Sequence, residues 1–424
     1  MKKKKLRKKR VIVSILLLFI LFVVSYLAFG YYERQKNGES KYLKINLNGD
    51  KEVVVKFGEK FEDLGASASY KDLDLTNKIE TENNVDYGHI GTYSYKYTIK
   101  YKKHKKEIER LVKVVDDVAP VVELNGNSTV RIVVGNEYHD LGAIANDNYD
   151  KDLSDKIEVD TSLLNMNTPG DYKVIYRVKD SSGNEGTAER LVSVEKKPPA
   201  NQKVAVINYH FFYKDWSEGC HESLCLRIDR FEEQLKYLND NGYYTLTIKE
   251  FVDWMYGEIE IPEKSVLLTI DDGAFGTSKI RGNYLIPALE KYKVHATLFL
   301  ITGWWGIDGG IDNYKSEYLD VQSHTHDLHY EAKCGHRSKV NCVSYDTLLK
   351  DLKQSIDVVK DTNSFCFPFY DYTEESIKAV KEAGFKVAFI GGYRKASRSD
   401  NKYKVPRYPV YDSTTLNQFI NMIK

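Results

Sequence analysis

The sequence predicts one membrane-spanning helix, two small all-β sandwiches and a C-terminal α/β domain, in that order. Three observations predict this order: a long apolar run near the N-terminus, an internal repeat with alternating apolar and polar residues, and apolar strands that alternate with amphipathic helices after a pair of prolines. The 424 residues are enough for about two to four domains. The expected boundaries are a cytoplasmic basic segment at 1–10, a transmembrane anchor at 11–30, sandwiches at 43–117 and 118–196, and the α/β domain at 203–424.

The N-terminus joins a basic cluster to an apolar run. Eight of the first ten residues are Lys or Arg, and the run Val11–Gly30 is interrupted only by Ser14, Ser25 and Tyr26. Such a run can cross a bilayer as a helix, and the positive-inside rule keeps its basic end in the cytoplasm. A cleaved signal peptide is the alternative, but the run exceeds a typical h-region and no small-x-small site follows Ala28. We therefore expect a single-pass anchor in the cell membrane, with the rest of the chain outside the cell.

The distribution of charge argues against nucleic acid as a partner. The formal net charge is +1, and eight of the 62 basic residues lie in the first ten positions. The remainder holds fewer basic residues than the 61 acidic ones, so it has no broad basic surface for nucleic acid.

The five cysteines lie outside the membrane in this prediction, where disulfides can form. Cys220 with Cys225, and Cys334 with Cys342, would each close a short loop and leave Cys366 over. A zinc knuckle that includes His336 is the alternative for the second pair, but its spacing fits no strong zinc pattern. We favour local disulfides or free thiols.

The two sandwiches are predicted from an internal repeat. The stretch Gly58–Ala66 matches Gly135–Ala143 at an offset of 77 residues, and Gly91–Tyr93 matches Gly170–Tyr172 later in each copy. Apolar and polar residues alternate within both copies, which is typical of half-buried strands. Several short strands in so few residues predict a small β-sandwich.

The repeats resemble the immunoglobulin-like modules of bacterial cell-surface proteins, joined at Asp116–Pro120. They could form a glycan-binding unit, but we favour a spacer, because the sequence identifies no aromatic platform. The acidic residues Asp147, Asp150 and Asp152 could bind calcium, although a solvated loop is the more common role of such a cluster.

Beyond the proline-rich hinge Lys196–Pro199 the pattern changes to alternating strands and helices. This alternation over the remaining residues predicts a parallel α/β fold such as a barrel, which places its chemistry at the C-terminal ends of the strands. The expected strands are 204–208, 266–270, 296–301 and 385–390, and the expected helices are 231–241, 284–292, 345–360 and 374–383.

Two motifs carry the predicted chemistry. The apolar strand 266–270 runs into Asp271 and Asp272, whose adjacent negative charges repel unless a cation neutralises one of them. Taken by itself, the pair Asp271 and Asp272 could equally be a solvated turn. Three histidines lie within six residues further on, and His324 and His329 could join an aspartate to bind a metal with positions left open for water and substrate. His326, between them, would point away in an extended segment.

These motifs resemble the polysaccharide deacetylases, carbohydrate esterase family 4, whose fold is the NodB-type deformed (β/α) barrel. Thr269–Gly273 resembles the first motif, Thr-Phe-Asp-Asp-Gly, and Ser323–Thr325 opens the second. The five-residue step from His324 to His329 is more like the branch that deacetylates poly-N-acetylglucosamine. Phe367–Tyr370 resembles the third motif, Arg-x-Pro-Tyr-Gly, with departures. The resemblance covers residues 203–424.

The resemblance implies a role for each matching residue. Asp272, His324 and His329 would bind a divalent metal, zinc by expectation, and Asp271 would be the general base. A backbone N–H near Phe369 or Tyr370 would help to hold the oxyanion.

The departures leave two roles to other residues. The family's late Leu-x-His motif is missing, so His210, His336 or Asp271 itself would supply the proton to the leaving group. Arg407 would replace the arginine of the third motif, where Cys366 precedes Phe367. Trp304, with its neighbour Trp305, would either stack on sugar rings or pack within its loop.

We therefore expect a hydrolase that removes N-acetyl groups from GlcNAc-type residues of an extracellular polysaccharide. Peptidoglycan is favoured because the wall is the polymer nearest to the anchor. A poly-β-1,6-GlcNAc deacetylase and an O-acetyl esterase are the alternatives within the enzyme class. A catalytically silent surface protein that binds glycan is the alternative from another class.

Overall fold

The computed structural model describes residues 2–424 apart from 221, 274–275, 278–281 and 306–309. Its first element is helix α1, Lys2–Ser40. The segment Val13–Glu33 of this helix has a mean hydropathy of 2.6 and is long and apolar enough to cross a membrane, and none of it is buried by the rest of the chain. The helix is longer than the expected span 11–30, because it continues through Gly30 into the polar residues on that side and begins within the basic segment on the other.

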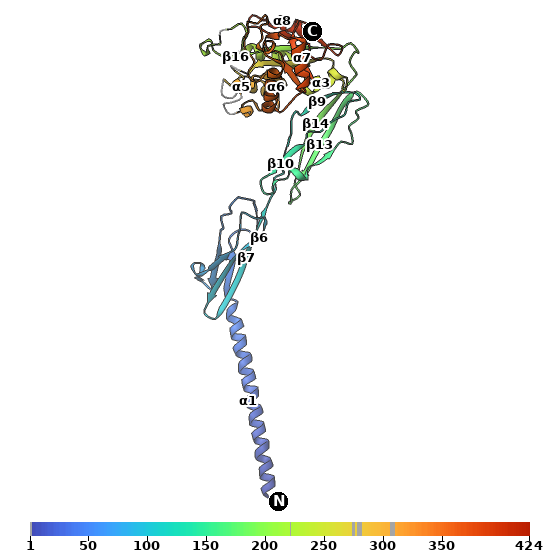
Figure 1. Ribbon diagram of the computed structural model, residues 1–424. Coiled ribbons are helices and arrows are strands. Elements are labelled where there is room, and N and C mark those ends of the chain that lie inside the picture. The colour runs from blue at the N-terminus through green and yellow to red at the C-terminus, as the bar shows by residue number, and fades with distance from the viewer. Residues whose placement is uncertain (1, 221, 274–275, 278–281, 306–309) are drawn as a thin grey trace. The chain divides into compact units, whose positions relative to one another are not determined.

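The first repeat forms an Ig-like sandwich of two sheets. Its two longest strands, β6 (Gly91–Tyr101) and β7 (His104–Val115), pair antiparallel from Gly91 with Val114 to Tyr101 with His104, and Figure 1 shows them side by side. One sheet contains β1 (Leu43–Leu47), β3 (Ala66–Tyr70) and β4 (Leu73–Asp74), and the other contains β2 (Glu52–Lys56), β7 (His104–Val115), β6 (Gly91–Tyr101) and β5 (Glu80–Asn83). The alternation in β6 buries every second side chain towards its end, which is why a period of two predicts this fold.

The second repeat has the same two-sheet plan. One sheet contains β11 (Lys151–Asp152), β10 (Ala143–Asp147) and β8 (Val121–Leu124), and the other contains β12 (Glu158–Asp160), β13 (Gly170–Lys179), β14 (Glu185–Glu195) and β9 (Thr129–Val133). As in the first repeat, where β2 pairs parallel with β7, the edge strand β9 pairs parallel with β14.

A buried polar network explains the residues that the two repeats share. In the first repeat Arg110 is fully buried and donates to Asp63, which also accepts from Tyr97. Asp63 lies in the repeated Asp-Leu-Gly segment, and Arg110 begins the repeated Arg-Leu-Val segment. In the second repeat Tyr176 likewise donates to Asp140, and Arg190 lies 3.9 Å from the same carboxylate as a longer ion pair. A buried arginine needs such partners.

The C-terminal domain is a closed parallel barrel of seven strands. The ring closes because β15 pairs with β19 on one side and with β25 on the other. Its strands are β15 (Lys203–Tyr209), β19 (Ser265–Asp272), β20 (Ala296–Leu300), β21 (Leu319–Ser323), β22 (Ser364–Cys366), β23 (Val387–Gly391) and β25 (Val405–Pro409). The central strand β19 is buried through its first seven residues, as a parallel strand covered on both faces must be.

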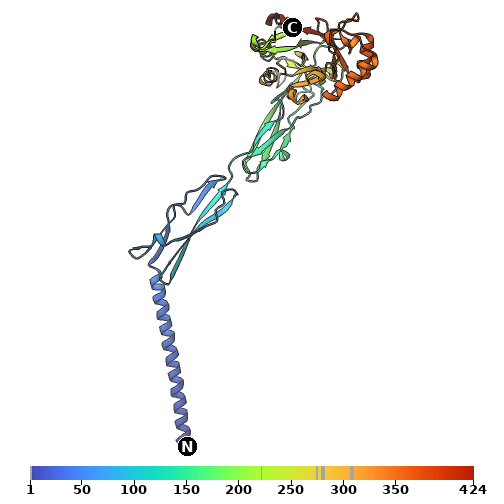
Figure 2. The ribbon, with the colours of Figure 1, turned by 60° about the vertical axis from the view of Figure 1, so that its left-hand side comes forward.

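Amphipathic helices cover the barrel. They are α2 (Ile228–Asp240), α3 (Ile248–Tyr256), α4 (Leu285–Tyr292), α6 (Tyr345–Val359), α7 (Glu374–Glu382) and α8 (Leu416–Ile423). Figure 2 shows α6 and α7 side by side at the surface of this domain. Hydroxyl side chains cap several N-termini, among them Thr247 for α3 and Ser344 for α6. The strands β22 and β25 were not expected from the sequence.

Candidate active site

The two aspartates at the end of β19 occupy different environments. Adjacent strand residues normally point to opposite faces, and here Asp272 has a positive φ of 76° while Gly273 has one of 80°. This turn leaves Asp271 2% exposed within the barrel and brings Asp272 to the histidines. A Cβ at Gly273 would lie 2.4 Å from Leu300, so only glycine fits the turn.

Asp272 meets two imidazoles from a different part of the chain. Its Oδ1 lies 3.4 Å from Nε2 of His324, directly after β21, and 3.2 Å from Nε2 of His329 in the following loop. These three ligand atoms lie within 4.8 Å of one another. Among the described residues, the buried Asp272 Oδ1 accepts no hydrogen bond.

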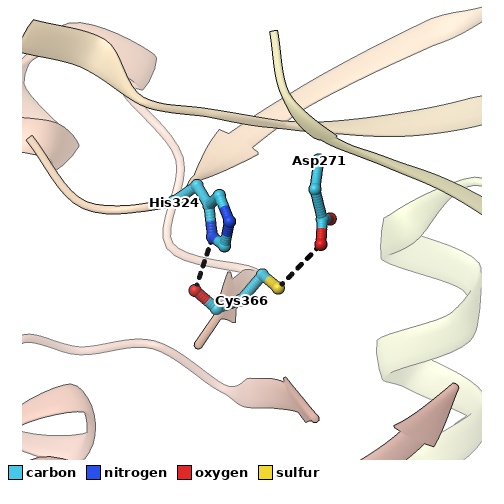
Figure 3. Close-up of side chains that lie close together, drawn as sticks. All are labelled: Asp271, His324 and Cys366. Atoms are coloured by element: carbon cyan, nitrogen blue, oxygen red, sulfur yellow. Dashed lines mark hydrogen bonds between the residues drawn. The ribbon is translucent and has the colours of Figure 1, made fainter. Parts of the chain in front are cut away.

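The arrangement fits a divalent metal. His324 Nδ1 donates to the backbone oxygen of Cys366 at 2.8 Å, a contact drawn in Figure 3, so the lone pair of His324 is on Nε2 and faces Asp272. Ligands at about 2.0–2.2 Å from a tetrahedral zinc are roughly 3.3–3.6 Å apart, close to the separations seen here. One carboxylate and two imidazoles suit zinc and similar ions, and leave positions open for water and substrate.

A second group of potential ligands, Asp271, His324 and Cys366, is also compact (Figure 3). Its charge is already balanced, because the Arg407 guanidinium donates to Asp271 Oδ1 at 2.8 Å and to Oδ2 at 2.7 Å. Arg407 also lies 2.8 Å from the Cys366 sulfur. A second cation at this point would be repelled by the fixed guanidinium. The set centred on Asp272 is therefore the candidate metal site.

Asp271 is held as a carboxylate by its surroundings. Burial raises the pKa of this carboxyl, but the two hydrogen bonds and the positive charge of Arg407 outweigh burial and hold the pKa well below its usual range. His210 approaches the same carboxylate, with Nε2 3.9 Å from Oδ2. Burial lowers the pKa of His210, and its buried Nδ1 has no hydrogen-bond partner among the described residues.

The structure places Arg407 where the third-motif arginine was expected to act. Arg407 reaches the active site from β25, is fully buried, and also donates to Thr269 Oγ1 at 3.1 Å. Cys366, which stands in the expected arginine position, points its sulfur at Asp271 Oδ2 from 3.5 Å. Only the sequence departure at Cys366 hinted that a distant arginine was needed.

The third-motif segment forms a wall beside the metal ligands. Phe369 and Tyr370 have consecutive positive φ angles of 58° and 59°, and the Phe369 ring lies 4.7 Å from the His329 ring. The Tyr370 hydroxyl donates to Asn208 Oδ1. The Tyr370 backbone N–H already donates to the Phe367 oxygen at 3.1 Å, so of the two expected oxyanion donors it is Phe369 that remains.

Trp304 lies beside the candidate metal ligands, in the short helix α5 (Thr302–Trp305), and its contacts there were not expected. Its ring is 5.8 Å from that of His329 and 4.8 Å from that of Tyr330, and its indole N–H donates to Asp327 at 2.8 Å. The side chain of Trp305 lies outside the described residues. Asp327 lies within the histidine motif and Tyr330 follows it directly, so their position in the sequence was the available signal.

Two other histidines lie away from the metal ligands. The His326 ring nitrogen contacts Thr302 at 3.0 Å, and its backbone N–H donates to Asp351. His336 is 40% exposed and contacts Asp371 at 3.3 Å.

Both cysteine pairs form disulfides, Cys220–Cys225 and Cys334–Cys342. The alternative of a zinc knuckle at Cys334 is therefore wrong, since both of its sulfur ligands are used in the disulfide.

Family comparisons agree with this architecture. Residues 258–388 match the family model described as polysaccharide deacetylase, and residues 45–114 and 122–194 match that of the bacterial surface protein Ig-like domain. The chain therefore carries a NodB-type polysaccharide deacetylase domain preceded by two bacterial surface Ig-like domains.

Curated relatives match the C-terminal half. The poly-beta-1,6-N-acetyl-D-glucosamine N-deacetylase of Staphylococcus aureus is 28% identical over 221 residues, which are 48% of this chain and 73% of the relative. The Staphylococcus epidermidis enzyme of the same name is 27% identical over 240 residues, which are 53% and 78% of the two chains.

Solved structures show weaker likeness. The Streptococcus pyogenes deacetylase PplD in complex with acetate is 20% identical with a TM-score of 0.46, over 52% of this chain and 98% of that chain. The polysaccharide deacetylase BC0361 from Bacillus cereus is 17% identical with a TM-score of 0.44, over 82% and 100%.

Proposed function

We propose that this chain is a membrane-anchored, extracytoplasmic N-deacetylase that removes acetyl groups from N-acetylglucosamine residues of an extracellular glycan, with zinc as its metal. The observation that carries the proposal is the pairing of two unlike aspartates. Asp272 faces two imidazole nitrogens through an oxygen that accepts no hydrogen bond from the described residues, while Asp271 is kept ionised by Arg407. A metal ligand next to a base is the arrangement that metal-assisted hydrolysis requires.

The location outside the membrane has three supports. The segment Val13–Glu33 can cross a membrane, the two domains that follow it match a bacterial surface family, and two disulfides are typical of an oxidising compartment.

The residues of the site divide the steps between them. A divalent cation held by Asp272, His324 and His329 would polarise the acetyl carbonyl and acidify a water molecule. Asp271 accepts a proton from the attacking water on a carboxylate oxygen, and Arg407 keeps that oxygen in place.

The same proton then leaves with the amine. Asp271 returns it to the nitrogen of the breaking amide bond, and the products are acetate and a free amine. His210, 3.9 Å from Asp271, is the second group that can hold this proton. His336 is bonded to Asp371 and lies outside the ligand cluster, so we do not assign it the role of acid.

Poly-β-1,6-GlcNAc is the substrate that we now favour over peptidoglycan. Two relatives named for that polymer are similar over most of their own length. The five-residue step between His324 and His329 supports the same choice. Proximity of the anchor to the wall, the only argument for peptidoglycan, says nothing about the sugar that fits the site.

Acetate release by the full chain in detergent micelles tests the proposal. The substrates are poly-β-1,6-GlcNAc, peptidoglycan and an O-acetylated xylan, each with added zinc or with a chelator. We expect zinc-dependent release from the first polymer, lost in Asp271→Asn and His324→Ala. The matched control is His326→Ala, which lies in the same loop but outside the ligand cluster and should retain activity.

Each other outcome points to a different function. Release from peptidoglycan alone would make the wall the substrate, and release from xylan alone would replace the amide by an ester. A folded, zinc-loaded chain that releases acetate from none of them would instead be a surface glycan-binding protein.

A further inference from the structure

Four aspartates gather where the second Ig-like domain meets the segment that precedes it. They are Asp116, directly after β7; Asp147, the last residue of β10; Asp150, in the following turn; and Asp180, directly after β13. One carboxylate oxygen from each lies within 4.8 Å of the others. All four belong to one compact unit of the chain, and they are called the Asp116 cluster below.

The negative charge of the cluster is not balanced by any cationic side chain among the described residues. Asp116, Asp147 and Asp180 are 7%, 8% and 7% exposed. Over the residues that the structure describes, no Lys, Arg or His forms an ion pair with any of the four. Like charges this close and this buried repel strongly. The folded arrangement therefore calls for a cation.

Two carboxylate oxygens of the cluster accept no hydrogen bond from the residues that the structure describes. Asp116 Oδ2 and Asp147 Oδ2 are buried and accept no hydrogen bond from the described part of the chain. The other oxygen of each is held, because Asp147 Oδ1 accepts from the backbone N–H groups of Tyr149 and Asp150, both at 2.8 Å. Asp116 Oδ1 accepts from the N–H of Val118 at 3.2 Å. One oxygen is thus fixed by the backbone while the other is left free for a ligand.

The remaining two carboxylates are also held in place. Asp150 Oδ2 accepts from both the N–H and the hydroxyl of Ser181 at 2.8 Å. Asp180 accepts from the backbone and the side chain of Asn184 at 2.8 and 2.7 Å. The cluster is therefore ordered before any cation arrives, which lowers the cost of binding.

The first Ig-like domain has the same fold but has other residues at two positions of the cluster. Asp147 lies two residues after the buried Ala145, and in the first repeat Tyr70 lies two residues after the buried Ala68. The two alanines are equivalent, because the backbone oxygen of each accepts the same hydrogen bond from a leucine N–H in its own domain.

The position of Asp180 also has an equivalent in the first domain, which is Tyr101. Asp180 lies four residues after Tyr176, and Tyr101 lies four residues after Tyr97. Tyr97 and Tyr176 are equivalent members of the buried polar network.

The first domain thus packs two aromatic rings where the second has two carboxylates. The ring centroids of Tyr70 and Tyr101 are 5.1 Å apart. Nothing in the sandwich requires acids at the positions of Asp147 and Asp180, so their presence in one repeat alone points to a ligand.

We propose that the Asp116 cluster binds one calcium ion. Every ligand atom that it offers is an oxygen, and several carboxylate oxygens without nitrogen or sulfur suit calcium rather than zinc. Extracellular calcium modules bind with dissociation constants of about 10⁻⁴–10⁻³ M, which is the range we expect here.

The ion would fasten the linker Asp116–Pro120 to the second domain. Asn184 already donates to the backbone oxygens of Asp116 and Val118 at 3.3 Å. A Cβ at Gly186 would lie 2.1 Å from the Pro120 oxygen, so the linker backbone lies directly on the start of β14. A cation shared by Asp116 and the three other carboxylates would protect this linker from cleavage.

Calcium titration of the full chain in detergent tests the proposal. The zinc site is filled first, and CaCl₂ is then added while the heat of binding and the thermal unfolding midpoint are measured. We expect about one calcium per chain, at the affinity of extracellular modules, and a rise of the midpoint that MgCl₂ does not reproduce. Proteolysis within the linker should slow in parallel.

Variants locate the response. Asp147→Asn with Asp180→Asn should abolish calcium binding, while Asp171→Asn, an exposed carboxylate at the far end of β13, should keep it. Asp147→Tyr with Asp180→Tyr copies the pair of the first domain and should give a folded chain whose unfolding ignores calcium. A folded wild-type chain without a calcium response, or an equal response in the double asparagine variant, would overturn the proposal.

Discussion

Arg407 donates hydrogen bonds to both carboxylate oxygens of Asp271, which lies 136 residues away in the sequence. Both side chains are buried from solvent. In the proposed mechanism, this ion pair makes Asp271 the base and leaves the adjacent Asp272 as the metal ligand. Arg407 thus contacts Asp271 although a cysteine, Cys366, stands in the position where the third motif has arginine.

Replacing Arg407 by methionine should shift the pH dependence of hydrolysis. The pKa of Asp271 is now depressed by Arg407, and without it burial would raise that pKa. The base form would then be lost at a higher pH, so the acidic limb of the kcat/KM profile should move upwards. A limb that stays in place while activity falls would mean that Asp271 is not the base.

The same substitution should destabilise the folded domain. Removing one partner of a buried pair costs about 3–5 kcal/mol. Arg394→Met breaks a bidentate pair between an exposed arginine and the partly buried Asp400, and should cost less, about 1 kcal/mol. The depressed pKa of Asp271 contributes stability above the unfolded-state pKa, and this contribution is lost as the pH falls through the folded-state pKa. Urea unfolding of both variants at neutral and acidic pH measures this difference.

Phe369→Ala should weaken metal binding without removing a ligand. The ring covers His329 at 4.7 Å, and the Arg337 guanidinium lies over the same ring at 4.9 Å. Loss of such outer contacts typically costs about 10–100-fold in metal affinity. Competition with a chromogenic zinc chelator measures it. An unchanged zinc affinity together with lost activity would assign Phe369 to the substrate instead.

Trp304→Ala should raise KM for the polymer more than it lowers kcat. Its ring packs on Tyr330 beside the metal ligands, where it can stack on a sugar. Tyr256→Ala removes an exposed aromatic on α3 and is the matched control, for which kinetics should not change. Equal KM values in both variants would leave Trp304 as a packing residue of α5.

Opening the Cys334–Cys342 disulfide should destabilise the loop after the metal ligands. A loop of eight residues corresponds to about 2–3 kcal/mol of chain entropy in the unfolded state. The double substitution to serine should lower the unfolding free energy by that amount, while zinc content stays near one. Loss of zinc would show that this loop positions His329 as well.

Patterns within a few residues predicted much of the molecule. The alternation in each repeat predicts its strands, and the run into Asp271 and Asp272 predicts a strand end that carries chemistry. These features could be predicted because a strand and its turn depend on neighbouring side chains. The short strands β22 and β25 were missed, because one has three residues and the other contains prolines that argue against a strand.

Only the tertiary structure decided which residues far apart in the sequence contact each other. Asp152, expected among the acidic residues of the second repeat, instead accepts hydrogen bonds from Ser154, while Asp116 and Asp180 complete the cluster from other strands. Arg407 likewise reaches Asp271 only because β25 closes the barrel next to β15. The sequence by itself determined which residues could do chemistry, since that depends on side-chain type and local pattern. Barrel closure and sandwich packing decided which of them meet, because burial brings together charges that no local spacing connects.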